Sequence, residues 1–249
     1  ELSFSGSTQD YYHLQEAEDF ELDVEDLCRT LLNGYDFLIL CNPNNPTSSA
    51  ILKDEMRALL SFCANRDIFV MIDETYVEFA PSVQEVTAVP YTKEFSNLMV
   101  LRGVSKFYAA PGMRFGYGIT GNKEFLSQMK EKQIPWSLNS LGAYAGEQMF
   151  KDTSYIRQTR ALILTERDRI FLELKKMSSF KVYFPYGNFI LVKILKPEVT
   201  SFDVFEACIK EGLMIRDCSS FQCLDGEFVR FCIMKPEDND RLLKVLKTI

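Results

Sequence analysis

Lys106 is the first residue of this chain whose surroundings suggest chemistry. It closely follows the apolar run Leu98–Leu101, so it lies near the end of a predicted strand rather than on a solvated helix face. Ser105 precedes it, and Arg114 follows eight residues later, beyond a Pro-Gly turn. A lysine can bond covalently to an aldehyde, and an arginine together with a hydroxyl can hold a phosphate. The spacing therefore predicts a binding site for a ligand that carries both groups.

Two further segments point to the same place. Asn42–Thr47 (Asn-Pro-Asn-Asn-Pro-Thr) follows one apolar run, and Asp73–Tyr76 (Asp-Glu-Thr-Tyr) follows another. Each has an ordinary explanation, because Asn-Pro repeats form turns and an aspartate can cap a helix. All three segments, however, stand where predicted strands end, and open α/β sheets bind ligands at the carboxyl ends of their strands.

The side chains of these segments are complementary, and together they fit pyridoxal 5'-phosphate (PLP). The protonated pyridine nitrogen of PLP needs a carboxylate, for which Asp73 is the candidate. The ring oxygen needs hydrogen-bond donors, which Asn45 and Tyr76 supply. Lys106 can bond to the aldehyde and then move protons, and the arginine and serine near it can hold the phosphate. The sequence therefore predicts PLP as the cofactor.

Strands and helices alternate along the first part of the chain. A helical stripe covers residues 53–66, and apolar runs that predict strands lie at 36–41, 68–72, 97–101 and 115–119. We expect the run 36–41 to be a buried strand. The alternation predicts an α/β fold with a mostly parallel sheet flanked by helices.

The pattern changes after Trp136. Residues 154–177 form a long, charged amphipathic stretch that suits a helix between two domains. The remainder reads as a smaller α+β unit, with strands at 180–184, 189–194, 214–216 and 228–233 and helices at 201–211 and 236–247. We therefore predict a large PLP-binding domain over residues 1–150, followed over residues 151–249 by the linking helix and a small C-terminal domain.

Composition excludes several classes of function. The net charge of −7 argues against nucleic acid or an anionic membrane as the main partner, and no apolar run is long enough to span a bilayer. A single histidine leaves little room for Ser-His-Asp or Cys-His catalysis. The seven cysteines form no Cys-x-x-Cys pair, which predicts free thiols in a reducing compartment, the cytoplasm. His13 lies far along the chain from Cys218 and Cys223, so we expect no metal site.

The chain resembles the class I/II aminotransferase family, the PLP-dependent transferases of fold type I. The resemblance rests on Asn42–Thr47, Asp73–Tyr76, Ser105–Arg114 and Val229–Phe231, in that order, and it covers essentially the whole chain. It implies that the cofactor is held by Lys106 as the Schiff-base lysine, Asp73 on the pyridine nitrogen, Asn45 and Tyr76 on the ring oxygen, and Ser105 and Arg114 on the phosphate. It also implies that Arg230 and Asn45 contact the substrate, and that the protein is a homodimer.

The chain departs from the family pattern at two positions. Ser48 stands where the family usually has glycine, and Gly103 stands where it often has serine or threonine, which removes one phosphate hydroxyl. The Gly-rich phosphate loop of the family and the aromatic residue that stacks on the cofactor ring match no part of this sequence. The residues Glu1–Thr8 resemble the end of a secondary-structure element that starts further upstream, so we expect an N-terminal part of the fold to be missing here.

Two branches of the family, both acting on phosphorylated amino compounds, are similar to this chain. Arg216 resembles a position that contacts the distal part of the substrate in both, although a surface salt bridge would also explain it. Pro111, Pro135–Asn139 and Met234 favour threonine-phosphate decarboxylase, whereas Tyr76–Phe79 favours histidinol-phosphate aminotransferase. We predict L-threonine-O-3-phosphate decarboxylase, with histidinol-phosphate aminotransferase or another amino acid aminotransferase as the alternative. A non-enzymatic sensor with this fold is disfavoured by the acidic charge and the lack of a DNA-binding module.

Overall fold

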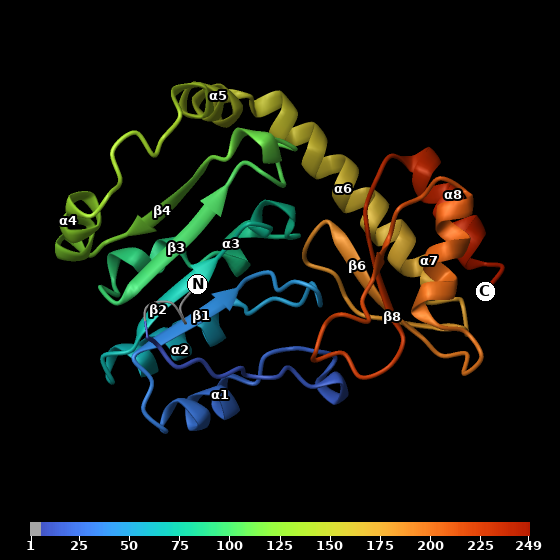
Figure 1. The fold of residues 1–249 in the computed structure, drawn as a ribbon, viewed down its shortest axis with the longest axis horizontal. Coiled ribbons are helices and arrows are strands. Elements are labelled where there is room, and N and C mark those ends of the chain that lie inside the picture. Colours follow the sequence, from blue (N-terminus) through green and yellow to red (C-terminus); the bar gives the residue numbers. More distant parts are fainter. Residues whose placement is uncertain (1–5) are drawn as a thin grey trace.

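The computed structural model describes residues 6–249, so most of the segment Glu1–Thr8 lies outside the described residues. The elements form two sheets, and the long helix α6 (Thr153–Leu174) runs from one to the other (Figure 1). This helix is the one predicted at 154–177. Within residues 6–249, no helix is both long and apolar enough to cross a membrane.

The N-terminal sheet has the strand order β1 (Phe37–Cys41), β2 (Phe69–Asp73), β3 (Leu98–Gly103) and β4 (Gly116–Thr120). β1, β2 and β3 are parallel, and β4 is antiparallel to β3, so the predicted mostly parallel sheet is confirmed. Helices α1 (Val24–Leu31) and α2 (Lys53–Ala64) bury their apolar faces with β1–β3 in one core. The short helix α3 (Val83–Val86) follows β2.

The expectation that residues 36–41 form a buried strand is wrong. β1 is the edge strand of the described sheet, and its side chains alternate, with Phe37 42% and Ile39 44% exposed. Both side chains line a cavity of about 680 Å³ that is also lined by residues 7–12. An apolar run predicts a strand, but it does not reveal whether both faces of that strand are covered.

The C-terminal sheet is antiparallel throughout, with the order β5 (Phe180–Val182), β6 (Phe189–Ile194), β8 (Phe228–Cys232) and β7 (Arg216–Asp217). Helices α7 (Ser201–Lys210) and α8 (Pro236–Leu246) pack with α6 and this sheet in a second core. The strand predicted at 214–216 is displaced toward the C-terminus, because Met214 is 85% exposed and pairing begins only at Arg216.

The sequence patterns did not single out four helices: α1, α3, α4 (Lys123–Glu131) and α5 (Ser140–Lys151). The three longer ones begin at a side-chain cap: Asp23, Asn122 and Asn139 accept hydrogen bonds from backbone amides of the first turns. α4 buries none of its residues. A helix without a buried stripe leaves little periodicity in the sequence, and only its cap residue could have indicated it.

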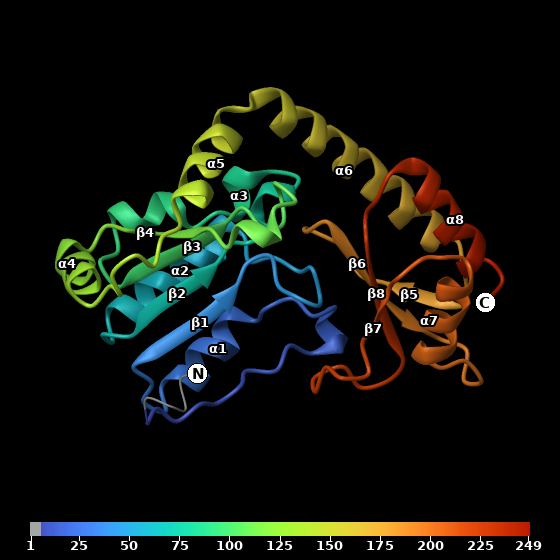
Figure 2. The same ribbon diagram turned by 45° about the horizontal axis from the view of Figure 1, so that its top comes forward.

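The two cores meet beside α6. Phe79 and Phe107, which follow β2 and β3, are 3% and 2% exposed and belong to the core of the C-terminal sheet. The turned view shows α6 arching above the space between the two sheets (Figure 2). The segments that follow β2 and β3 are therefore packed directly against the second half of the chain.

Candidate active site

The carboxyl ends of β1 and β2 carry two of the predicted segments next to each other. Cys41 and Asp73 are register partners, and the amide of Asn42 donates to the carbonyl of Asp73 at 2.9 Å. Asp73 is half-buried, and its Oδ1 accepts a hydrogen bond from the backbone amide of Thr75 at 2.8 Å. The carboxylate thus has a defined orientation at the end of the middle one of three parallel strands, where ligands of such sheets bind.

The loop Asn42–Thr47 is fixed by hydrogen bonds of its first residue, Asn42. The side chain of Asn42 is fully buried, accepts from the amide of Ile51 at 2.8 Å and donates to two backbone carbonyls at 3.0 and 2.9 Å. Both Asn–Pro peptide bonds of the loop are cis. Asn45 is exposed beyond this anchor, and its Oδ1 accepts a hydrogen bond from Nη1 of Arg230 on β8. This bond joins the N-terminal sheet to the C-terminal sheet.

Lys106 is positioned by its neighbours in the chain. Val104 and Phe107 are 1% and 2% exposed, and the carbonyl of Phe107 accepts a hydrogen bond from the hydroxyl of Tyr155 on α6 at 2.8 Å. Lys106 itself is exposed, and its Nζ lies 5.9 Å from the centre of the Tyr76 ring. Buried anchors on both sides of an accessible amine suit a lysine that reacts with a ligand.

Aromatic contacts connect Lys106 with Arg230. The ring of Tyr76 meets the ring of Phe189 edge to face, with centroids 5.0 Å apart. The guanidinium carbon of Arg230 lies 5.0 Å from the centre of the same Phe189 ring. Successive contacts therefore link Lys106 through Tyr76 and Phe189 to Arg230, which is bonded to Asn45. Phe189 was missed by the sequence reasoning, because a phenylalanine inside an apolar strand carries no signal beyond core packing.

Arg216 lies beside Arg230, because the two are register partners on β7 and β8. Directly opposite residues of an antiparallel pair place their side chains on the same face of the sheet. Arg216 is exposed, its Nη2 donates to Oγ of Ser220 at 2.8 Å, and its guanidinium lies 5.5 Å from the ring of Phe221. A surface salt bridge was the alternative role for Arg216, but none of the ion pairs within residues 6–249 includes Arg216.

The proposed phosphate ligands are less closely assembled. Arg114 is exposed, has a left-handed backbone with φ 48°, and donates to the carbonyl of Pro111 in its own turn at 3.2 Å. Ser105 is half-buried, and its Oγ would lie 4.0 Å from a Cβ added at Gly103. The two residues lie at opposite ends of the turn that contains Lys106, and the described contacts do not join them.

A buried ion pair behind Asp73 was also missed by the sequence reasoning. Glu74 is fully buried, and its Oε2 lies 2.7 Å from Nη2 of Arg102, near the end of β3. Glu74 also accepts from the hydroxyl of Thr87 at 2.8 Å. Burial raises the pKa of Glu74, and the guanidinium of Arg102 limits this rise. The pair fixes the chain directly after Asp73 to the strand that leads to Lys106.

The thiols near the site are poorly suited to nucleophilic catalysis. Both residues are exposed, but desolvation by the surrounding side chains, aided by the charge of Asp73, raises the pKa of Cys41 to about 11, and desolvation also raises the pKa of Cys232. Both therefore stay protonated at neutral pH. Elsewhere, Nδ1 of His13 lies 2.9 Å from Sγ of Cys223, so these two residues, far apart in the sequence, are in contact. Residues 6–249 contain no group of three or more His, Cys, Asp or Glu side chains that could hold a metal ion.

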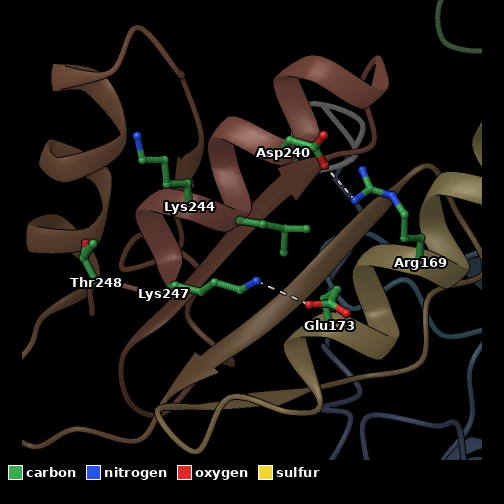
Figure 3. Close-up of a pocket in the computed structure, with 7 residues that line it drawn as sticks. Arg169, Glu173, Asp240, Lys244, Lys247 and Thr248 are labelled. Carbon is green, nitrogen blue, oxygen red and sulfur yellow. Dashed lines mark hydrogen bonds and ion pairs between the residues drawn. The ribbon is translucent and has the colours of Figure 1, made fainter.

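A separate pocket lies between α6 and α8, on the C-terminal part of the molecule (Figure 3). Its charged side chains largely pair with one another: Arg169 with Asp240 at 2.7 Å, and Lys247 with Glu173 at 3.4 Å. It contains none of the residues of the predicted site. The charges of these four side chains are thus explained by ion pairs across the pocket.

The donor set between the two sheets suits PLP. An oriented carboxylate stands at the end of the middle parallel strand, an accessible amine lies beside a tyrosine ring, and an amide and an arginine close the far side. These groups match a ring nitrogen, an aldehyde, a ring oxygen and a substrate anion. The fold and the site together define a PLP-dependent enzyme of the α/β class.

A sequence model of the family "Aminotransferase class I and II" matches residues 2–246, and the chain belongs to this family of PLP-dependent enzymes. It is 29% identical over 248 residues to the threonine-phosphate decarboxylase of Salmonella typhimurium, covering 100% of this chain and 66% of that protein. It is 30% identical over 244 residues to the histidinol-phosphate aminotransferase of Methanococcus aeolicus, covering 98% and 64%. The chain thus spans about two thirds of the length of these curated relatives.

Solved structures agree with this assignment. The crystal structure of the histidinol-phosphate aminotransferase from Clostridium acetobutylicum superposes with a TM-score of 0.91 at 33% identity, over 99% of this chain and 72% of that one. The relatives are divided between a decarboxylase and an aminotransferase, so the family is established while the reaction is a separate question.

Proposed function

We propose that the full protein is a PLP-dependent enzyme acting on a small phosphorylated amino compound. The observation that carries this proposal is the placement of Arg216 and Arg230 as register partners at the edge of the site. Arginines bind carboxylates and phosphates through paired, charge-assisted hydrogen bonds. Two of them side by side, with Arg230 bonded to Asn45, suit a substrate with two anionic groups.

When bound, PLP supplies an electron sink that stabilises negative charge on the substrate Cα. In this proposal the Asp73 carboxylate holds the proton of the ring nitrogen, and Tyr76 and Asn45 donate to the ring oxygen. Ser105 and Arg114 bind the cofactor phosphate. The roles of Asn45, Asp73, Tyr76 and Ser105 are supported by their positions at or after the carboxyl ends of parallel strands, and Arg114 lies just before β4.

The arginines decide the reaction by orienting the substrate. Arg230 and Arg216 would hold the anionic groups of the substrate, and the orientation they impose would decide whether its carboxylate or its Cα proton is released. In a transamination the amine of Lys106 would accept that proton. Lys106 can carry this proton because its amine is accessible and lies near the Tyr76 ring.

Our choice between these reactions is L-threonine-O-3-phosphate decarboxylase. Pro111, the Pro135–Asn139 segment and Met234 support it, as does the similarity to the Salmonella enzyme. Histidinol-phosphate aminotransferase is the second candidate, supported by the Clostridium structure at 33% identity and by Tyr76–Phe79. We further propose a cytoplasmic homodimer, which sedimentation of the full protein would test.

The deciding experiment gives the full, PLP-loaded protein O-phospho-L-threonine alone and, separately, histidinol phosphate with 2-oxoglutarate. Release of CO2 without an oxo-acid supports the decarboxylase, and formation of glutamate supports the aminotransferase. Arg216→Gln should raise KM for the accepted substrate by about tenfold to a hundredfold, since a charged hydrogen bond to its anion is lost. Arg57→Gln, which breaks an exposed pair with Glu94, is the matched control. Turnover of neither substrate by the wild-type protein would refute the proposal.

A further inference from the structure

Ser48 occupies a backbone conformation that favours glycine. It follows the Asn42–Thr47 loop, its φ is 63°, and its side chain is fully buried. A residue with a Cβ is disfavoured in this left-handed region, where glycine is not. The amide of Ser48 donates to the carbonyl of Asn44 at 2.9 Å, so the turn itself would form equally well with glycine. The presence of a serine therefore calls for a reason outside the turn.

That reason lies in the other half of the molecule. The hydroxyl of Ser48 accepts a hydrogen bond from the amide of Gly187 at 2.8 Å, and its carbonyl accepts one from the amide of Tyr186, also at 2.8 Å. Both donors belong to the loop that leads into β6. The fit is close, since a Cβ added at Gly187 would lie 3.1 Å from the Ser48 hydroxyl oxygen. Figures 1 and 2 both draw the loop after β1 pointing toward β6.

The same loop is held on its other side by α6. Arg167 is 1% exposed, and its Nη1 donates to the carbonyl of Tyr186 at 3.3 Å and to that of Phe79 at 2.9 Å. Phe79 follows β2, so this arginine also spans the two sheets. The loop before β6 is thus fixed between Ser48 and Arg167, and it has little freedom to move relative to the N-terminal sheet.

The contacts of Ser48 bear directly on the site. Asn45, three residues before Ser48, accepts from Arg230, and β8 carries Arg230 opposite Leu191 of β6. Two residues after Gly187, Phe189 begins β6 and contacts the Tyr76 ring. We propose that Ser48 is a positioning residue, whose hydroxyl ties the Asn45 loop to the start of β6 and so sets Arg230 relative to Asn45 and Tyr76. The consequence for substrate binding rests on the proposed function, whereas the hydrogen bond between Ser48 and Gly187, called the tie below, does not.

The test compares Ser48→Gly with Ser48→Ala in the full, PLP-loaded protein. Both remove the acceptor of the Gly187 amide, but only glycine also removes the disfavoured backbone conformation. Ser49→Ala is the matched control, because among residues 6–249 the Ser49 hydroxyl bonds only to Thr47 within the same loop, at 2.8 Å. Hydrogen exchange of the Gly187 amide, read by NMR, reports the tie without any turnover.

Loss of one hydrogen bond should speed exchange at Gly187 by about threefold to tenfold in both Ser48 variants, and leave it unchanged in Ser49→Ala. KM for the accepted phosphorylated substrate should rise by a similar factor with a smaller change in kcat, because the arginine is displaced while the reacting amine is not. Unchanged exchange at Gly187 overturns the proposal, and so does an equal rise of KM in Ser49→Ala. If the wild-type protein turns over neither substrate, the proposed function fails, and exchange at Gly187 alone decides whether the tie exists.

Discussion

Replacing Glu74 by glutamine is the sharpest test of how the site is supported. The Glu74 side chain is 0% exposed and that of Arg102 17% exposed. One oxygen of Glu74 accepts from Nε and Nη2 of Arg102 at 3.0 and 2.7 Å, and the carboxylate also binds the Thr87 hydroxyl and the amide of Ala88. Glu74→Gln keeps the size and removes the charge, so the largely buried guanidinium loses its nearest carboxylate and keeps the more distant one of Glu78, at 3.9 Å.

Removing one partner of a buried ion pair costs about 3–5 kcal/mol. For a chain of this length, each kcal/mol lowers the melting temperature by roughly 2–4 °C, so the expected decrease is roughly 6–20 °C. Urea unfolding of the full protein, followed by circular dichroism, measures the free energy directly. Glu85→Gln is the control, because Glu85 pairs with Lys53 at an exposed site, where a pair contributes about 0–1 kcal/mol.

A small effect would refute this reasoning in an informative way. If Glu74 were protonated in the folded protein, glutamine would resemble it closely, and stability would hardly change. A decrease no larger than that of Glu85→Gln would therefore show that burial, not Arg102, determines the protonation of Glu74. A loss in the double variant Glu74→Gln/Arg102→Gln smaller than the sum of the single losses would measure the coupling of the pair.

Three further results are expected. Lys106→Ala should abolish the visible absorbance of the imine between cofactor and protein, together with borohydride fixation of the cofactor to the chain; retention of the fixed adduct at another lysine would contradict the assignment. Asp73→Asn should leave the cofactor bound but lower kcat by orders of magnitude, and unchanged kcat would exclude its role at the ring nitrogen. Burial acts to raise the pKa of Glu16, but hydrogen bonds from Lys193 and Tyr183 hold this pKa below its usual 4.5. The ionised Glu16 therefore stabilises the fold above pH 4.5, and this contribution is lost as the pH falls through the lower pKa of the folded state. Glu16→Gln should flatten this part of an acid unfolding curve, and an unchanged curve would show that these bonds contribute nothing.

The sequence predicted those strands, helices and candidate residues whose own segment contains a recognisable pattern. Apolar runs located the strands of both sheets to within a few residues, and a charged amphipathic stretch located α6. Lys106, Asp73 and Asn45 became candidate site residues because unusual side chains directly follow strands, and their roles stay predictions. The helices α4 and α5 were missed, because exposed helices leave only their caps as evidence. The division into domains at residue 150 stays a prediction.

Other features depend on contacts between distant segments, which no local pattern contains. The Ser48–Gly187 bond joins residues 139 apart, and the Arg230–Asn45 bond joins residues 185 apart. In the sequence, Ser48 is only a departure from the glycine usual in the family, and Phe189 is part of an apolar run; the fold places both beside the site.

The sequence by itself determined the chemistry available to this protein, because reactivity belongs to side-chain types and their order on successive strands. The family, the cofactor and the candidate lysine and carboxylate all followed from that order. Only the tertiary structure decided which charges lie side by side and which residues hold them there. Arg216 and Arg230 become neighbours through the pairing of β7 with β8, and Arg230 meets Asn45 through the packing of two sheets. Such distances arise from the cooperative burial of both cores, so they are properties of the folded chain as a whole.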